Sequence, residues 1–183
     1  MQNLEDAAEN GGLEMTPSSL PQGAFTCVVT LERVRNPTFV RDERDGVTYL
    51  TARDYELAYR TVLRFENGDV LPITAKLVGE LNQQVIVRDA SGRPVRVSGY
   101  TQGRSEISDG TGNLIFEGRY YDSRVVQPLA GDDALTLTGQ RIVDHWQNGL
   151  GRGAFAGHAF SLGSRLTREA TAALSGDAHG HID

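Results

Sequence analysis

The sequence contains a single cysteine, Cys27, and a single lysine, Lys76, and each shortage excludes some chemistry. One cysteine cannot form a disulfide within the chain or a cysteine zinc cluster. It lies in the apolar run 25–31, which is typical of a small core residue. One lysine makes Schiff-base chemistry a poor expectation, because all the other basic residues are arginines.

Long apolar runs are also missing. No stretch approaches the about 18 residues that a membrane-spanning helix needs, and no charged segment precedes an apolar leader. We therefore expect a cytoplasmic protein with no membrane partner. The formal net charge of −6 argues against nucleic acid as a partner, because nucleic acid is itself an anion.

Proline is scarce and glycine is abundant, with 6 and 21 residues in a chain of 183. This composition suits one β-rich domain with many turns. Residues 1–23 are acidic and weakly apolar, and they are predicted to be a flexible arm, with docking as a lid the alternative. The barrel domain is placed at 24–166. Residues 167–183 are expected to form a short helix followed by a disordered tail.

One glycine-rich motif, G-x-G-x-x-x-F-x-G, occurs twice, at 110–118 and at 149–157. Each copy opens on a turn dipeptide, Asp109-Gly110 or Asn148-Gly149, and runs into strand-like sequence. A repeated turn and bent strand predicts a curved antiparallel sheet. A phosphate loop is rejected because no helix is expected after either copy.

Polar and apolar residues alternate along most of the chain, which predicts strands. The alternation is strongest over 47–65, with a helix over 52–64 as the alternative. Short turns are predicted at Asp45-Gly46, Asn67-Gly68 and 89–93. About eight or nine strands with short connections favour an all-β fold, a closed antiparallel barrel of about eight strands. The predicted strands are 24–35, 47–65, 70–81, 84–88, 94–107, 113–126, 134–146 and 154–166.

The two glycine-rich units resemble those of the allene oxide cyclase and dirigent-type barrels, over about 109–166. The resemblance implies a barrel with a hydrophobic central cavity. Bacterial relatives in that family include polyketide cyclases, such as spirotetronate-forming Diels–Alderases. Those enzymes need no cofactor and act by folding a flexible substrate, so no cofactor is expected here.

Aromatic and hydrogen-bonding residues within the predicted strands supply the candidate site. His158, Arg141 and Tyr59 are the catalytic candidates, and His158 is expected to be the buried histidine. The alternative is that the aromatic residues are ordinary core while Arg141 and His145 face solvent. No metal is expected, and the cluster of His179, His181 and Asp183 near the end is attributed to chance. The substrate-binding candidates are Tyr55, Tyr121, Trp146 and Phe160.

The predicted function is a cofactor-independent cyclase or isomerase that orients a small hydrophobic, polyketide-like substrate. Two alternatives stay open. One is a lipocalin-like carrier, and the other is an interaction module whose lumen is filled by its own side chains. A cavity of a few hundred Å³ would separate the ligand-binding hypotheses from the module. A dimer or trimer of the chain is a further open option.

Overall fold

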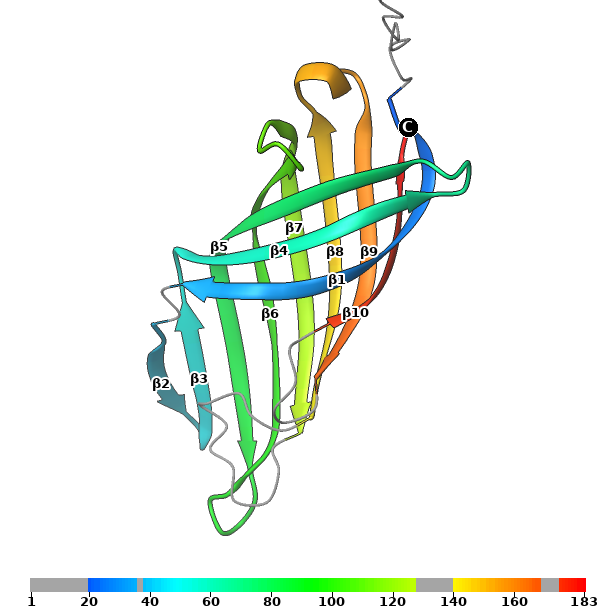
Figure 1. The fold of residues 1–183 in the computed structure, drawn as a ribbon. Helices are drawn as coiled ribbons and strands as arrows, with labels where there is room; N and C mark the ends of the chain where they lie inside the picture. The colour runs from blue at the N-terminus through cyan, green and yellow to red at the C-terminus, as the bar shows by residue number, and fades with distance from the viewer. Residues whose placement is uncertain (1–19, 36–37, 128–139, 169–174) are drawn as a thin grey trace, which may run out of the picture.

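A computed structural model describes residues 20–35, 38–127, 140–168 and 175–183 of the chain. Most of the predicted arm therefore lies outside the described residues, as do 169–174 of the predicted terminal helix. Leu20, from the end of the arm, packs against the core. The described chain is built from strands, together with a short 3-10 helix η2 at Gly153–Phe155 (Figure 1).

Eight of the ten described strands close a barrel, which confirms the predicted fold class. Every pairing is antiparallel. The ring closes because β5 pairs with β6 as well as with β4. β2 and β3 form a hairpin that extends the sheet beyond the ring, at the lower left of Figure 1. The strands are β1 Gly23–Arg35, β2 Val40–Arg44, β3 Val47–Ala52, β4 Tyr55–Phe65, β5 Val70–Arg88, β6 Pro94–Asp109, β7 Leu114–Gln127, β8 Gln140–Gly151, β9 Ala159–Arg168 and β10 Ser175–Ile182.

The three predicted turns connect strands as expected. Asp45 and Gly46 both have positive φ, 51° and 75°, as the two-residue turn between β2 and β3 requires. Gly68 has φ 92° in the turn between β4 and β5. Between β5 and β6, the Asp89 carboxylate accepts hydrogen bonds from the backbone N–H groups of Ser91 and Arg93, at 3.0 Å each. These turns are set by local chemistry, which is why the sequence predicts them.

The stretch 47–65 is a strand pair and not a helix, so the helical alternative over 52–64 is wrong. β3 and β4 pair with β5 in one continuous register, interrupted only at Arg53 and Asp54. Asp54 has φ 54° and donates its N–H to the carbonyl of Gly79 at 2.8 Å. Opposite it, Glu80 is an extra residue in β5 relative to β6. Both strands exchange their inward and outward faces at this corner.

Residues 175–182 form strand β10, so the predicted disordered tail is wrong for this segment. β10 pairs with β1 on one side and β9 on the other, and it completes the ring. Ala178 and Ile182 face inward and are buried, while His179 and His181 are exposed. Gly180 lies between them on the same face, but the ring of Phe25 occupies the space that a side chain there would need. Ala178 and Ile182 are therefore the only apolar side chains by which the sequence indicates this strand.

Only the first copy of the glycine-rich motif forms a turn followed by a strand. Asn148-Gly149 lies inside β8, and the second phenylalanine lies in η2, so the predicted second turn is wrong. The two copies nevertheless meet, because the rings of Phe116 and Phe155 lie 5.1 Å apart between centroids. The ring of Phe160 stacks on Phe25 and packs at a tilt against Phe116, at centroid distances of 5.6 and 5.2 Å.

The barrel interior has two apolar ends, which we name the upper and lower cores from their places in Figure 1. The upper core contains Phe25, Leu63, Phe116, Phe155 and Phe160. The lower core contains Leu50, Ile86, Val97 and Val126, with Phe39 packed against them. Between the two cores a group of inward-facing side chains is polar and buried.

Candidate functional site

The polar side chains between the two cores are brought together by strand register. Asn82 of β5 pairs with Thr101 of β6, Thr101 with Asp122 of β7, and Asp122 with His145 of β8. All four are buried, with exposed fractions between 1% and 6%. One row across four strands therefore carries a carboxylate, an imidazole, an amide and a hydroxyl. We call the space around this row the central chamber.

His145 and Asp122 form a buried hydrogen-bonded pair, with side chains 3% and 7% exposed. The imidazole Nδ1 bonds to Asp122 Oδ1, and Nε2 lies 3.3 Å from Gln147 Oε1. Both ring nitrogens thus face acceptor oxygens, which favours the doubly protonated ring. Burial alone would lower the pKa of His145, but the Asp122 charge and these hydrogen bonds raise it above its ordinary value.

Three tyrosines border the pair. The rings of Tyr59 and Tyr120 each lie 6.1 Å from the His145 ring, measured between centroids. Burial raises the pKa of Tyr59, of Tyr120 and of Tyr55, so all three hydroxyls are neutral donors near pH 7. The hydroxyls of Tyr55 and Tyr120 have no hydrogen-bond partner among the described residues.

Two glycines make room for two of these rings. Gly79 and Gly103 pair directly across β5 and β6. A Cβ at Gly79 would lie 2.2 Å from the Tyr55 ring, and one at Gly103 would lie 2.7 Å from the Tyr120 ring. Both tyrosines can therefore lie against the inner wall of the barrel, where larger side chains would exclude them.

A cavity of about 80 Å³ lies on one side of the central chamber. Asp122 lines it, while His145 lies behind the carboxylate. Val34 also lines it and is 45% exposed, so the cavity reaches the surface beside the end of β1. Sites for drug-sized ligands usually span about 300–1,000 Å³, so this cavity suits a much smaller molecule. Its lining is completed by Leu31, Phe39, Tyr55, Leu57, Tyr59, Asn82, Thr101, Arg124, Arg141 and Val143.

The structure brings together three of the seven site residues predicted from sequence. Tyr55, Tyr59 and Arg141 all line the cavity. Phe160 faces inward but belongs to the packed upper core. His158 lies between η2 and β9, half-buried, where its Nδ1 bonds to the backbone carbonyl of Asp183. It is therefore not the buried histidine, and that prediction is wrong.

The placement of Tyr121 and Trp146 inside the barrel is also wrong. They are 42% and 47% exposed, and their rings lie 5.7 Å apart on the outer wall. Their inward-facing neighbours Tyr120 and His145 are the ones that reach the chamber. The alternative that His145 faces solvent fails for the same reason.

Asp122, His145 and Arg124 are the chargeable chamber residues that the sequence did not identify as site residues, and Asn82, Thr101 and Tyr120 were missed as well. A usable signal exists in β7, because Tyr120, Asp122 and Arg124 share the parity of the core residue Phe116. In β8 both faces carry polar and apolar residues, so the sequence does not indicate which face points inward.

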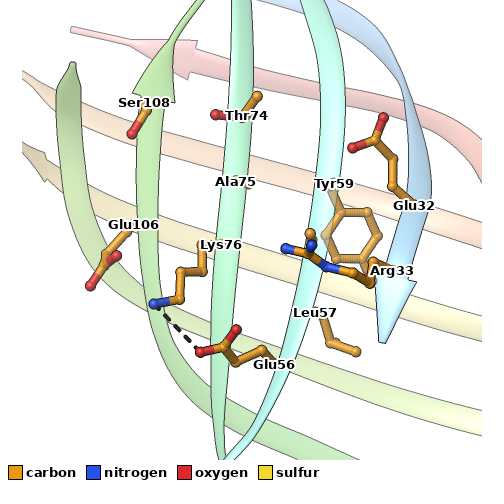
Figure 2. A pocket seen from close by; sticks show the side chains of 11 residues that line it. Glu32, Arg33, Glu56, Leu57, Tyr59, Thr74, Ala75, Lys76, Glu106 and Ser108 are labelled. Carbon is orange, nitrogen blue, oxygen red and sulfur yellow. Dashed lines mark ion pairs between the residues drawn. The ribbon is translucent and has the colours of Figure 1, made fainter. Parts of the chain in front are cut away.

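A second hollow, of about 300 Å³, lies across β1, β4, β5 and β6 (Figure 2). Charged side chains surround it, and Lys76 pairs with Glu56 at 3.6 Å, drawn as the dashed line. These two side chains are 49% and 34% exposed, so water screens the pair. We assign no function to this hollow. Within the described ranges, no group of three or more His, Cys, Asp or Glu side chains is placed to hold a metal ion.

Comparisons with known proteins find no matching family model, no matching curated protein and no matching solved structure. The fold and the site therefore define a class only, a closed antiparallel β-barrel with a polar chamber between two apolar cores. The resemblance to allene oxide cyclase and dirigent-type barrels stays a prediction. In the part of the chain that is described, no helix has the length and apolar character needed to cross a membrane.

Proposed function

We propose that the central chamber is the active site of a cofactor-independent isomerase that moves a proton on a small, partly apolar carbonyl compound. The observation that carries this proposal is the buried Asp122 carboxylate, which lines the cavity together with Tyr55 and Tyr59. A carboxylate base facing neutral hydroxyl donors is an arrangement suited to shifting a proton next to a carbonyl.

The chemistry balances without any added reagent. The Asp122 carboxylate would take a proton from the carbon next to the carbonyl, and the electron pair would move onto the carbonyl oxygen as an enolate. A tyrosine hydroxyl, neutral because of its raised pKa, would donate a hydrogen bond to that oxygen. In a β,γ-unsaturated carbonyl compound the enolate is a dienolate, and return of the proton from Asp122 to the γ-carbon completes the isomerisation to the conjugated compound. Cyclisation, as the resemblance implies, would require the enolate carbon to attack an electrophilic carbonyl or conjugated carbon of the same substrate, with the proton on Asp122 passing to the anion that results.

His145 would act as a positioning residue. Its bond to Oδ1 fixes the orientation of the Asp122 side chain, whose carboxylate lines the cavity. The carboxylate is thereby held where it would meet the substrate. Arg141, a catalytic candidate from the sequence, lines the same cavity and could contact the substrate oxygen.

The cavity volume limits the size of the substrate. At about 10–15 Å³ for each water-sized group, about 80 Å³ holds a molecule of up to about eight non-hydrogen atoms, and Leu31, Leu57 and Val143 would contact its apolar part. This argues for a substrate smaller than the polyketide expected from the resemblance.

Proton transfer can be tested without knowing the substrate. The protein is incubated in D₂O with a panel of small ketones and enones, and NMR follows deuterium incorporation and double-bond movement. We expect exchange with the unmodified chain and a loss of about 10²- to 10⁴-fold in Asp122→Asn, the usual contribution of a general base.

Two control variants separate the chamber from the rest of the barrel. Asp144→Asn removes a carboxylate that pairs with Arg165 on the surface, and His158→Gln removes the histidine predicted from sequence. Both should retain exchange. If ketones bind to the chamber and none exchanges or isomerises, the barrel is a carrier and the proposed reaction is excluded.

A further inference from the structure

Arg124 is a buried charge to which no carboxylate of the described residues is bonded. Its side chain points inward from β7, is 6% exposed and lines the cavity. Its Nη2 donates to the neutral amide oxygen Asn82 Oδ1 at 3.0 Å, and its Nε has no hydrogen-bond partner among the described residues. A buried guanidinium is stable when its charge is balanced and its donors are bonded.

The other charged groups of the chamber do not supply that balance. Among the described residues, Asp122 is the one carboxylate that lines the cavity, and its Oδ1 is bonded to His145. With His145 protonated, that pair is neutral as a unit. Tyr55 and Tyr59, which line the same cavity, are neutral. Within the described lining, the charge of Arg124 therefore has no bonded carboxylate, and its Nε is a donor open to a ligand.

We infer that the ligand of the central chamber is a short carboxylic acid, whose carboxylate binds to Arg124. A carboxylate matches the planar guanidinium fork and carries the single negative charge that Arg124 leaves unbalanced. A phosphate monoester would bring about two charges and suits the site less well.

This inference rests on the proposed function, because it names the substrate class for the same cavity. Asp122 and Arg124 are two positions apart on β7, which separates them by about 7 Å along the strand. A carboxylate at Arg124 would thus place carbons a few bonds away beside Asp122. The substrate would be a short keto acid, saturated or unsaturated, with its ketone and reactive carbons near the far end.

Calorimetry with a matched ligand pair tests this inference. The keto acid 4-oxopentanoate and its neutral amide have the same length and shape, and differ in charge. We expect the acid to bind about 10- to 100-fold more tightly than the amide, the range that hydrogen bonds to charged groups contribute. Equal affinities would overturn the inference, as would tighter binding of inorganic phosphate than of the acid.

Two variants locate the effect. Arg124→Met keeps much of the side-chain volume, removes the charge and should abolish the preference for the acid. Arg165→Met, which removes an exposed arginine paired with Asp144, should keep that preference. A preference that survives in Arg124→Met would overturn the inference.

A measurement on the unmodified chain covers the case in which Arg124→Met does not fold. With ¹⁵N-labelled arginine, the Nε–H signal of Arg124 should shift on addition of 4-oxopentanoate, and an unchanged signal would contradict the inference. Selective binding of the acid without deuterium exchange would remove the proposed reaction and leave the anion site standing. Exchange of neutral ketones without selectivity for the acid would exclude the anion site and leave the proposed reaction standing.

Discussion

Replacing Asp122 by asparagine tests the electrostatics of the central chamber, because the substitution keeps the side-chain shape and removes the charge beside His145. Both side chains of the pair are more than nine-tenths buried. Breaking a buried ion pair by removing one partner costs about 3–5 kcal/mol. We expect the free energy of unfolding of Asp122→Asn to fall by that amount at pH 5, where His145 is protonated.

The pH dependence should change sign in the variant. In the unmodified chain the pKa of His145 is raised, so the pair stabilises the fold below the unfolded-state pKa of about 6.5. That contribution is lost as the pH rises through the higher folded-state value. Without Asp122, burial dominates and lowers the pKa, so stability should instead increase as the pH rises toward about 6.5.

Urea unfolding at pH 5, 7 and 9 measures both effects, and an NMR titration of the His145 ring gives the folded-state pKa. Asp144→Asn is the matched control, since its exposed pair with Arg165 should contribute less than about 1 kcal/mol. The electrostatic reasoning is refuted if Asp122→Asn and Asp144→Asn show the same dependence of stability on pH.

Three further predictions concern the barrel itself. Burial raises the pKa of Cys27 to about 11, so the folded chain should resist a thiol-specific disulfide reagent at pH 8 and react once urea unfolds it; prompt reaction when folded would contradict its burial. Gly103→Ala would place a Cβ 2.0 Å from the Val78 carbonyl and 2.7 Å from the Tyr120 ring, and should lower the free energy of unfolding by about 1–3 kcal/mol. Ile182→Ala truncates a fully buried side chain of β10 and should cost about 2–5 kcal/mol in urea unfolding. A neutral effect there would mean that β10 does not hold the ring closed.

Local chemistry made much of the fold predictable from the sequence. The turns at Asp45-Gly46 and Asn67-Gly68 need positive φ, and their residue types favour it, so the strands on either side could be placed. β10 was missed because its stability comes from backbone pairing with β1 and β9 and not from a strong apolar pattern. Such pairing joins segments that are far apart in the chain, and no local pattern reports it.

The candidate site was less predictable for a related reason. Tyr55 and Tyr59 were found because β4 alternates cleanly between its two faces. Asp122 and His145 are 23 positions apart, and only the register between β7 and β8 puts them in contact. Burial of His158 was predicted from its apolar neighbours in the sequence. The segment between η2 and β9 lies at the end of the barrel, where the side chain is only half-buried.

The corner at Asp54 and Glu80 has a consequence for how the length of this chain can change. Each strand carries one extra residue there, and the two extra residues face each other across the same ladder. Removing both would leave every side chain of β4 on its present face while straightening the ribbon that bends across the barrel. We expect the alternation of side chains to survive such a double deletion and the bend at this corner to be lost. The bend of the ribbon thus depends on two residues that the apolar pattern does not mark.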